Sequence, residues 1–223
     1  MNNFRCLLLF FFSGLLTASA QQKISVDDFT TRNTFGERKV SGINWMKDGR
    51  YYTTLSDNKL VRYDVTTGKA VETLVDGASL TPAIVIDEYT FSADEKKLLL
   101  QTQKQSIYRR SFVAEYFVYD LGSNRLQPLS SRGKQSYATF SPDGNRVAFV
   151  RENNLFYVSL PGMEEKQVTN DGRFNSIING TTDWVYEEEF SFVVGFEWSP
   201  DGRTIAYYRF DERAVKEYNL QLW

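Results

Sequence analysis

The sequence has 223 residues, of which 24% are charged, and its formal net charge is −2 at pH 7. This mild acidity excludes the basic surface of a typical nucleic-acid-binding protein, so we expect no nucleic-acid partner. The sequence contains no histidine and one cysteine. These counts exclude a Ser-His-Asp triad and a histidine-ligated zinc site within these residues, and we expect neither a cofactor nor a bound metal ion.

The first twenty residues have the pattern of a secretory signal peptide. Arg5 supplies a positive charge, residues 7–12 form an apolar run, and Ala18-Ser19-Ala20 is a small-residue cleavage site. The apolar run is too short for a stable membrane span, and Cys6 lies beside it. We therefore expect a secreted or periplasmic mature chain that starts near Gln21, without cysteine and without a transmembrane span.

Residues 21–40 are polar and unpatterned, and we interpret them as an N-terminal lead-in segment. From residue 41 onwards, one motif recurs: an aromatic residue followed by a turn built on Asp-Gly or a close relative. The aromatic residues are Trp45, Phe91, Phe140 and Trp198, which lie 46, 49 and 58 residues apart. Repeats of this length are typical of propellers and related arrays.

Each repeat contains the same series of predicted strands. Second strands are predicted over 51–55, 98–102, 147–150 and 205–208, third strands over 60–63, 114–119 and 155–158, and fourth strands over 71–74 and 166–169. Four antiparallel strands per repeat predict an all-β fold, a partial β-propeller of about four blades over residues 41–223. A β-sandwich with coincidental spacing is the less favoured alternative, because the four turns fall at equivalent positions. We find no helical periodicity of useful length.

Two segments are longer than the repeat requires. Residues 103–113 connect two strands of the second repeat and carry Arg109, and residues 170–190 carry three consecutive glutamates. Alternate connections of antiparallel strands lie at opposite ends of a blade, so both insertions are expected on the same face. Carboxylates that meet a guanidinium there would suit the ammonium group of a peptide amino terminus. Trp184 and Tyr186 are expected to pack and so to set the direction of the glutamates.

The segment Asp183-Trp184-Val185-Tyr186-Glu187-Glu188-Glu189 resembles the signature of the dipeptidyl peptidase IV family of serine exopeptidases, in the prolyl oligopeptidase clan. Residues 108–111 resemble the arginine-bearing blade loop of that family. The resemblance implies that Glu188 and Glu189 bind the free amino terminus of a peptide substrate and that Arg109 contacts a backbone oxygen near its second residue. It also implies release of X-Pro or X-Ala dipeptides from amino termini.

The resemblance further implies a propeller of eight blades and a C-terminal α/β-hydrolase domain that supplies the catalytic residues. We therefore expect this chain to be a fragment of a longer enzyme, inactive alone, whose full-length form can dimerise with itself. The alternative is a short, non-catalytic secreted propeller that binds peptide or protein partners. A continuation with a Gly-x-Ser-x-Gly elbow and a later histidine would favour the enzyme.

Overall fold

The structure is a computed structural model that describes residues 24–32, 34–36 and 42–218. The predicted signal peptide lies outside the described residues. The chain divides into two units, residues 1–40 and 41–223. In the first unit, α1 (Val26–Thr30) follows Ser25, whose amide and hydroxyl donate hydrogen bonds to Asp28 at 2.7 and 2.8 Å. This local cap stabilises a single turn, which is too short to leave a periodic pattern in the sequence.

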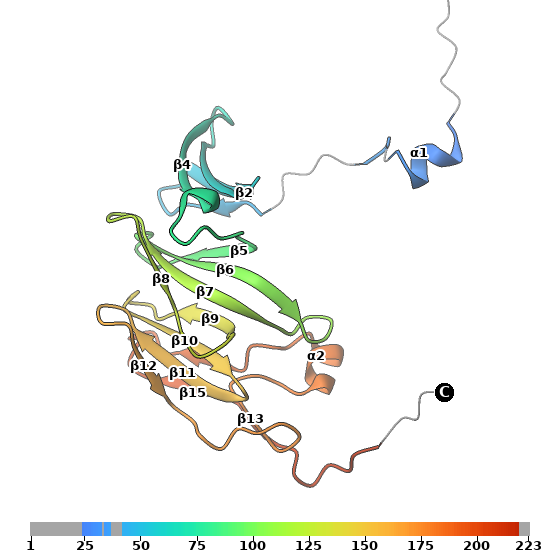
Figure 1. The fold of residues 1–223 in the computed structure, drawn as a ribbon, viewed down its shortest axis with the longest axis vertical. Helices are drawn as coiled ribbons and strands as arrows, with labels where there is room; N and C mark the ends of the chain where they lie inside the picture. The colour runs from blue at the N-terminus through green and yellow to red at the C-terminus, as the bar shows by residue number, and fades with distance from the viewer. Residues whose placement is uncertain (1–23, 33, 37–41, 219–223) are drawn as a thin grey trace, which may run out of the picture. The chain divides into compact units, whose positions relative to one another are not determined.

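The second unit contains three consecutive four-stranded antiparallel sheets, drawn in turn from cyan to yellow and orange in Figure 1. The first sheet contains β1 (Asn44–Trp45), β2 (Tyr51–Ser56), β3 (Lys59–Asp64) and β4 (Ala70–Asp76); the second contains β5 (Glu88–Phe91), β6 (Lys97–Ser106), β7 (Phe112–Asp120) and β8 (Arg125–Pro128); the third contains β9 (Ser136–Phe140), β10 (Arg146–Arg151), β11 (Asn154–Ser159) and β12 (Glu164–Gln167). A 3-10 turn, η1 (Gly77–Ser79), leads from the first sheet toward the second. The predicted partial β-propeller of four-stranded blades is confirmed.

The fourth repeat differs from the prediction. Its elements are β13 (Ile177–Asn179), α2 (Trp184–Phe190), β14 (Phe196–Trp198), β15 (Ile205–Tyr207) and β16 (Arg209–Asp211). The strand predicted over 205–208 is interrupted at Tyr208. β15 pairs with β14, whereas β16 pairs with β13, which comes from a segment expected to be only an insertion. The two α-helices among the described residues are five and seven residues long, and neither is long and apolar enough to cross a membrane.

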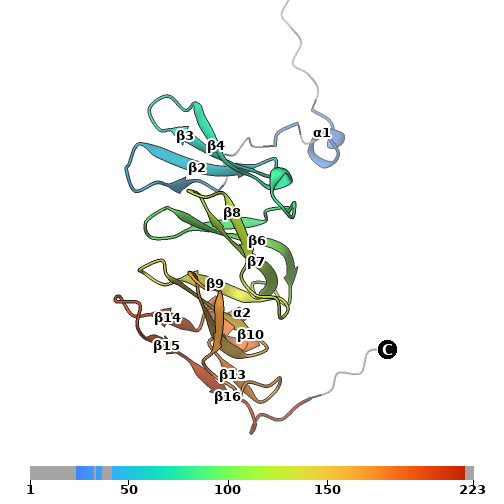
Figure 2. The same cartoon turned by 60° about the vertical axis from the view of Figure 1, so that its left-hand side comes forward.

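The second and third sheets bury both of their faces, because each packs between two neighbours in Figures 1 and 2. In β6, Leu98 and Leu100 join an apolar cluster with Leu60 of the first sheet. Leu99, between them, points the other way and joins a cluster with Phe149 of the third sheet. A third cluster connects the third sheet to β14 in the same manner. Successive side chains of a strand alternate between faces, so a continuous apolar run here serves two separate cores.

The repeated turn keeps the same local structure in several repeats. In three repeats the turn serine donates a hydrogen bond of 2.5 or 2.6 Å to the turn aspartate, in the pairs Ser92–Asp94, Ser141–Asp143 and Ser199–Asp201. Gly144 and Gly202 follow these aspartates with φ of +67°, a conformation that favours glycine. Glu95 takes the equivalent position in the second repeat at φ +56°. Its carboxylate accepts the backbone N–H of Lys47 at 2.8 Å, which connects it to the turn of the first repeat.

The insertion in the second repeat extends two strands instead of forming a long loop. β6 continues to Ser106 and β7 begins at Phe112, so only residues 107–111 form the connection. The pairing register shifts between Thr102 and Gln105, and Gln103 has φ +52°. A bulge of this kind increases the local twist of a strand pair and redirects it. The hairpin of β6 and β7 therefore projects beyond its own sheet, as Figure 1 shows.

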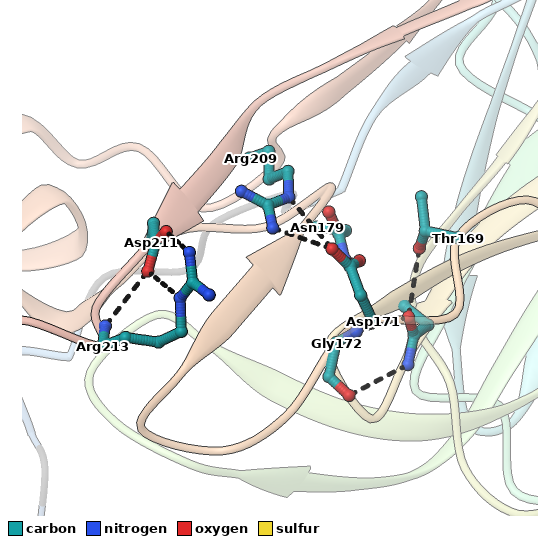
Figure 3. Close-up of polar contacts among 8 residues, drawn as sticks. Thr169, Asp171, Gly172, Asn179, Arg209, Asp211 and Arg213 are labelled. Atoms are coloured by element: carbon teal, nitrogen blue, oxygen red, sulfur yellow. Dashed lines mark hydrogen bonds and ion pairs between the residues drawn. The ribbon is translucent and has the colours of Figure 1, made fainter.

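A polar network connects β13 and β16 to the segment that follows β12, and Figure 3 shows its members. Arg209 donates two hydrogen bonds to Asp171, at 2.8 and 3.1 Å, and the amide of Asn179 donates to the same carboxylate at 2.8 Å. Asn179 is fully buried. It begins Asn179-Gly180-Thr181, which matches the N-glycosylation sequon. Because its amide is enclosed and bonded, the folded chain disfavours a glycan at this position.

We predict that Leu98→Ala and Leu99→Ala each lower the free energy of unfolding by about 2–5 kcal/mol. The reason is that these adjacent side chains lie in different buried layers. Urea denaturation of the full-length protein and of each variant measures both losses. Val71→Ala is the control, since Val71 is 47% exposed on β4, and it should change stability by less than about 1 kcal/mol. A small effect of either leucine variant would contradict burial of both faces and favour a two-layer sandwich.

Candidate functional site

The three consecutive glutamates lie on α2, and this helix begins at a well-defined cap. The carboxylate of Asp183 accepts the backbone N–H of Tyr186 at 2.8 Å, as an N-cap residue does. The helix ends at Ser191, which adopts a left-handed conformation with φ 55°. The sequence shows no helical periodicity of useful length here, because a helix of seven residues is too short to produce one. Successive residues of a helix point in directions about 100° apart, so the three carboxylates cannot all face the same ligand.

Glu187 joins α2 to the tip of the β6–β7 hairpin, and Figure 1 shows the two elements side by side. Its side chain is buried, and Oε1 accepts the backbone N–H groups of Arg110 at 2.6 Å and of Ser111 at 2.8 Å. The residues that meet here are 76 and 77 positions apart in the sequence. Two amide donors on one carboxylate oxygen are an arrangement that stabilises its charged form.

The pKa of Glu187 reflects this environment. Burial raises the pKa of this carboxyl, but hydrogen bonds from Ser111 and from the amide of Arg110, together with the positive charge of Arg110, outweigh burial and hold the pKa below its ordinary value. Glu187 is therefore a charged, buried anchor between the helix and the hairpin. Sequence reasoning gave it no separate role, because only the helical geometry distinguishes it from the two glutamates that follow.

Glu188 and Arg109 are brought together, as the shared position of the two insertions predicts. Arg109 Nε lies 3.1 Å from Glu188 Oε2. The Arg109 side chain is 73% exposed, whereas that of Glu188 is 16% exposed. An ion pair with one partner so well hydrated stabilises a protein by only about 0–1 kcal/mol. The guanidinium can therefore leave Glu188 at little cost, which makes this carboxylate accessible to another cation.

Glu189 and the two aromatic residues have different surroundings. Glu189 is exposed on the same helix. Tyr186 packs against Phe190 and Phe210, with ring centroids 5.4 and 4.9 Å apart, so it connects α2 to β16. Trp184 is 55% exposed and lines a cavity beside the helix. Of the two predicted supporting residues, only Tyr186 is thus in contact with another aromatic ring of the described chain.

The site suits a cationic ligand better than a metal ion. The three carboxylates have different surroundings: Glu187 binds backbone amides, Glu188 pairs with Arg109, and Glu189 is exposed. Within the part of the chain that the structure describes, no group of three acidic, histidine or cysteine side chains is arranged to hold a metal ion. A single ammonium group, which needs only a few oxygen acceptors, fits this arrangement.

Comparisons with known proteins identify the family to which the chain is similar. Residues 92–222 match the family described as the dipeptidyl peptidase IV (DPP IV) N-terminal region. Dipeptidyl peptidase 4 of Trichophyton rubrum is 34% identical over 209 residues, which are 92% of this chain and 26% of that protein. Human prolyl endopeptidase FAP is 31% identical over 178 residues, which are 77% of this chain and 23% of that protein.

A solved structure gives a similar result. The crystal structure of Porphyromonas gingivalis dipeptidyl peptidase 4 is 41% identical and superposes with a TM-score of 0.80, covering 91% of this chain and 30% of that one. The chain thus spans about a quarter of the length of the curated relatives it matches. The matched family region, residues 92–222, includes the hairpin of β6 and β7 and the helix α2. The chain belongs to the dipeptidyl peptidase IV family and corresponds to its N-terminal region.

Proposed function

We propose that this chain is the substrate-recognition portion of a secreted or periplasmic serine exopeptidase, which releases X-Pro or X-Ala dipeptides from peptide amino termini. Glu188 and Glu189 bind the α-ammonium group, and Arg109 binds a backbone oxygen near the second residue. The observation that carries the proposal is the contact of Arg109 with Glu188 across two insertions far apart in sequence. The sequence holds no histidine, so the catalytic base of such an enzyme comes from an α/β-hydrolase domain outside these residues.

Binding proceeds by exchange of one cation for another. Without substrate, the Arg109 guanidinium neutralises Glu188. The α-ammonium takes that place, and its charge-assisted hydrogen bonds to the carboxylates each contribute about 1.5–3 kcal/mol. Arg109 is then available to donate hydrogen bonds to a peptide oxygen. Holding an amino terminus and a backbone oxygen together limits how much of the substrate extends toward the catalytic domain, which restricts cleavage to short amino-terminal segments.

Glu187 acts as a positioning residue in this scheme. It contacts no substrate, but it fixes the amides of Arg110 and Ser111 against the helix that carries Glu188. Arg109 immediately precedes these anchored residues in the chain. The separation of the guanidinium from the carboxylates is therefore set by hydrogen bonds of Glu187, and a helix of only seven residues gains tertiary support that it lacks in isolation.

We predict that Glu188→Gln in the full-length protein lowers kcat/KM for a chromogenic Gly-Pro substrate by about 10- to 100-fold, because one charge-assisted hydrogen bond to the α-ammonium is lost. Steady-state kinetics measure the change. Glu164→Gln is the matched control, because Glu164 is an exposed glutamate of β12, and its kinetics should equal those of the unmodified protein. Unchanged kinetics of Glu188→Gln would refute the assignment. A full-length protein that binds such peptides without cleaving them would instead favour a non-catalytic peptide-binding propeller.

We predict a pH-dependent loss of stability for Glu187→Gln. The pKa of Glu187 is lowered on folding, so its charged form stabilises the fold above the unfolded pKa of about 4.3. This contribution disappears as the pH falls through the lower, folded pKa. Urea denaturation should therefore show a clear deficit of the variant at pH 7 that shrinks on acidification below about pH 4. A deficit of equal size at both pH values would show that the charge of Glu187 does not matter.

A further inference from the structure

A cavity of about 440 Å³ lies beside α2, the helix that carries Glu188, the ion-pair partner of Arg109. Neither of these residues lines it, and neither does Glu189. Its walls come from the hairpin tip of β6 and β7, the turn between β10 and β11, the segment before β13, the start of α2 and the segment after β16. Its volume falls in the range of about 300–1,000 Å³ that is typical of ligand sites.

The walls are apolar and aromatic, although the cavity is open to solvent. Tyr108, Phe174 and Trp184 line it, and they are 50%, 78% and 55% exposed. Ile107, which is 52% exposed, adds an aliphatic surface beside them. Large exposed side chains that converge on one hollow are unusual, because they leave apolar area in contact with water. A ligand with an apolar stem would remove this area from solvent.

The charged groups that line the cavity all have the same sign. Glu152, Asp183, Glu187 and Glu212 contribute carboxylates, and no lysine or arginine is among its lining residues. Glu187 is already bound to two backbone amides. Glu212, held in place by its backbone N–H bond to Ser176 at 2.7 Å, forms no ion pair with any described residue. Burial raises the pKa of Glu212, and the negative charge of Asp183 raises it further.

The arginines nearest to Glu212 in the sequence are bound elsewhere, as Figure 3 shows. Arg213 donates to Asp211 at 2.8 Å, and Arg209 donates to Asp171 at 2.8 and 3.1 Å. Both guanidiniums are therefore engaged by other carboxylates, and neither compensates Glu212. A negative cavity with aromatic walls thus lacks a cation from the part of the chain that the structure describes.

We propose that this cavity binds the side chain of an arginine residue in a polypeptide, with the guanidinium between Glu212 and Asp183. A planar guanidinium both pairs with carboxylates and stacks on aromatic faces, and its aliphatic stem covers apolar wall. Trp184 and Tyr108 supply the rings that this stem and cation contact. The site differs from the proposed α-ammonium site, so a peptide with a blocked amino terminus is also a ligand.

The test compares two blocked peptides, acetyl-Ala-Arg-Ala-amide and the same peptide with citrulline, which has nearly the same shape as arginine but no charge. Isothermal titration calorimetry with the full-length protein should show the arginine peptide binding at least about tenfold more tightly. Glu212→Gln should remove most of this difference, and Trp184→Ala should weaken binding of both peptides. Glu164→Gln, which removes an exposed carboxylate outside the cavity, should leave both affinities unchanged.

Equal affinities for the two peptides, or an unchanged preference in Glu212→Gln, would overturn the proposal. Tighter binding of 1,5-diaminopentane than of the arginine peptide would overturn the assignment to a polypeptide and indicate a small diamine. Acetylation removes the α-ammonium group, so none of these results depends on whether Glu188 binds an amino terminus. The circular dichroism of Glu212→Gln should match that of the unmodified protein, because no hydrogen bond of the described residues involves the Glu212 side chain.

Discussion

The hydrogen bonds that Glu187 accepts from the hairpin tip are the interaction on which the site depends. The sheets provide a common end at which two inserted segments emerge, but they do not by themselves fix the distance between them. A seven-residue helix and the projecting end of a hairpin are each marginal alone. The buried carboxylate satisfies two amides of the hairpin and ties the helix to it, so each segment stabilises the other. Because Arg109 precedes Arg110 and Glu188 follows Glu187, this contact also holds Arg109 close to Glu188.

The same junction divides the surroundings of α2 into two electrostatic environments. At Glu188, an exposed guanidinium compensates a carboxylate, and the pair is weak enough to exchange for a ligand. In the cavity beside the start of α2, Asp183 and Glu212 contribute carboxylates, and no lysine or arginine is among the lining residues of the described chain. Glu187 lines the same cavity, but it is stabilised by the backbone amides of Arg110 and Ser111 and by the positive charge of Arg110. The carboxylates at the start and along this short helix therefore differ in their partners: Glu187 binds backbone amides of the hairpin, Glu188 binds a guanidinium, and Asp183 caps the helix.

Much of the fold could be predicted because its signals are repeated. Apolar strands and Asp-centred turns recur, and in three of the four repeats the turn aspartate accepts a hydrogen bond from the turn serine. The shared face of the insertions followed from antiparallel connectivity, and the contact between Arg109 and Glu188 agrees with it. The helix α2 could not be predicted, because seven residues with three adjacent like charges leave no periodic signal. The pairing of β13 with β16 could not be predicted, because each strand has only three paired residues. The role of Glu187 could not be predicted either, because its hydrogen-bond donors are backbone amides, which every residue has.

Burial of both faces has a consequence for how such a chain is made. As the ribosome releases one sheet after another, each new sheet covers the open face of the sheet before it and exposes an apolar face of its own. Leu98 and Leu100 of β6 can dock as soon as the second sheet forms, whereas Leu99 waits for the third. At each stage of elongation, the most recently formed sheet of the nascent chain therefore exposes an apolar face to solvent. Until the next sheet covers it, such a surface is prone to associate with other chains.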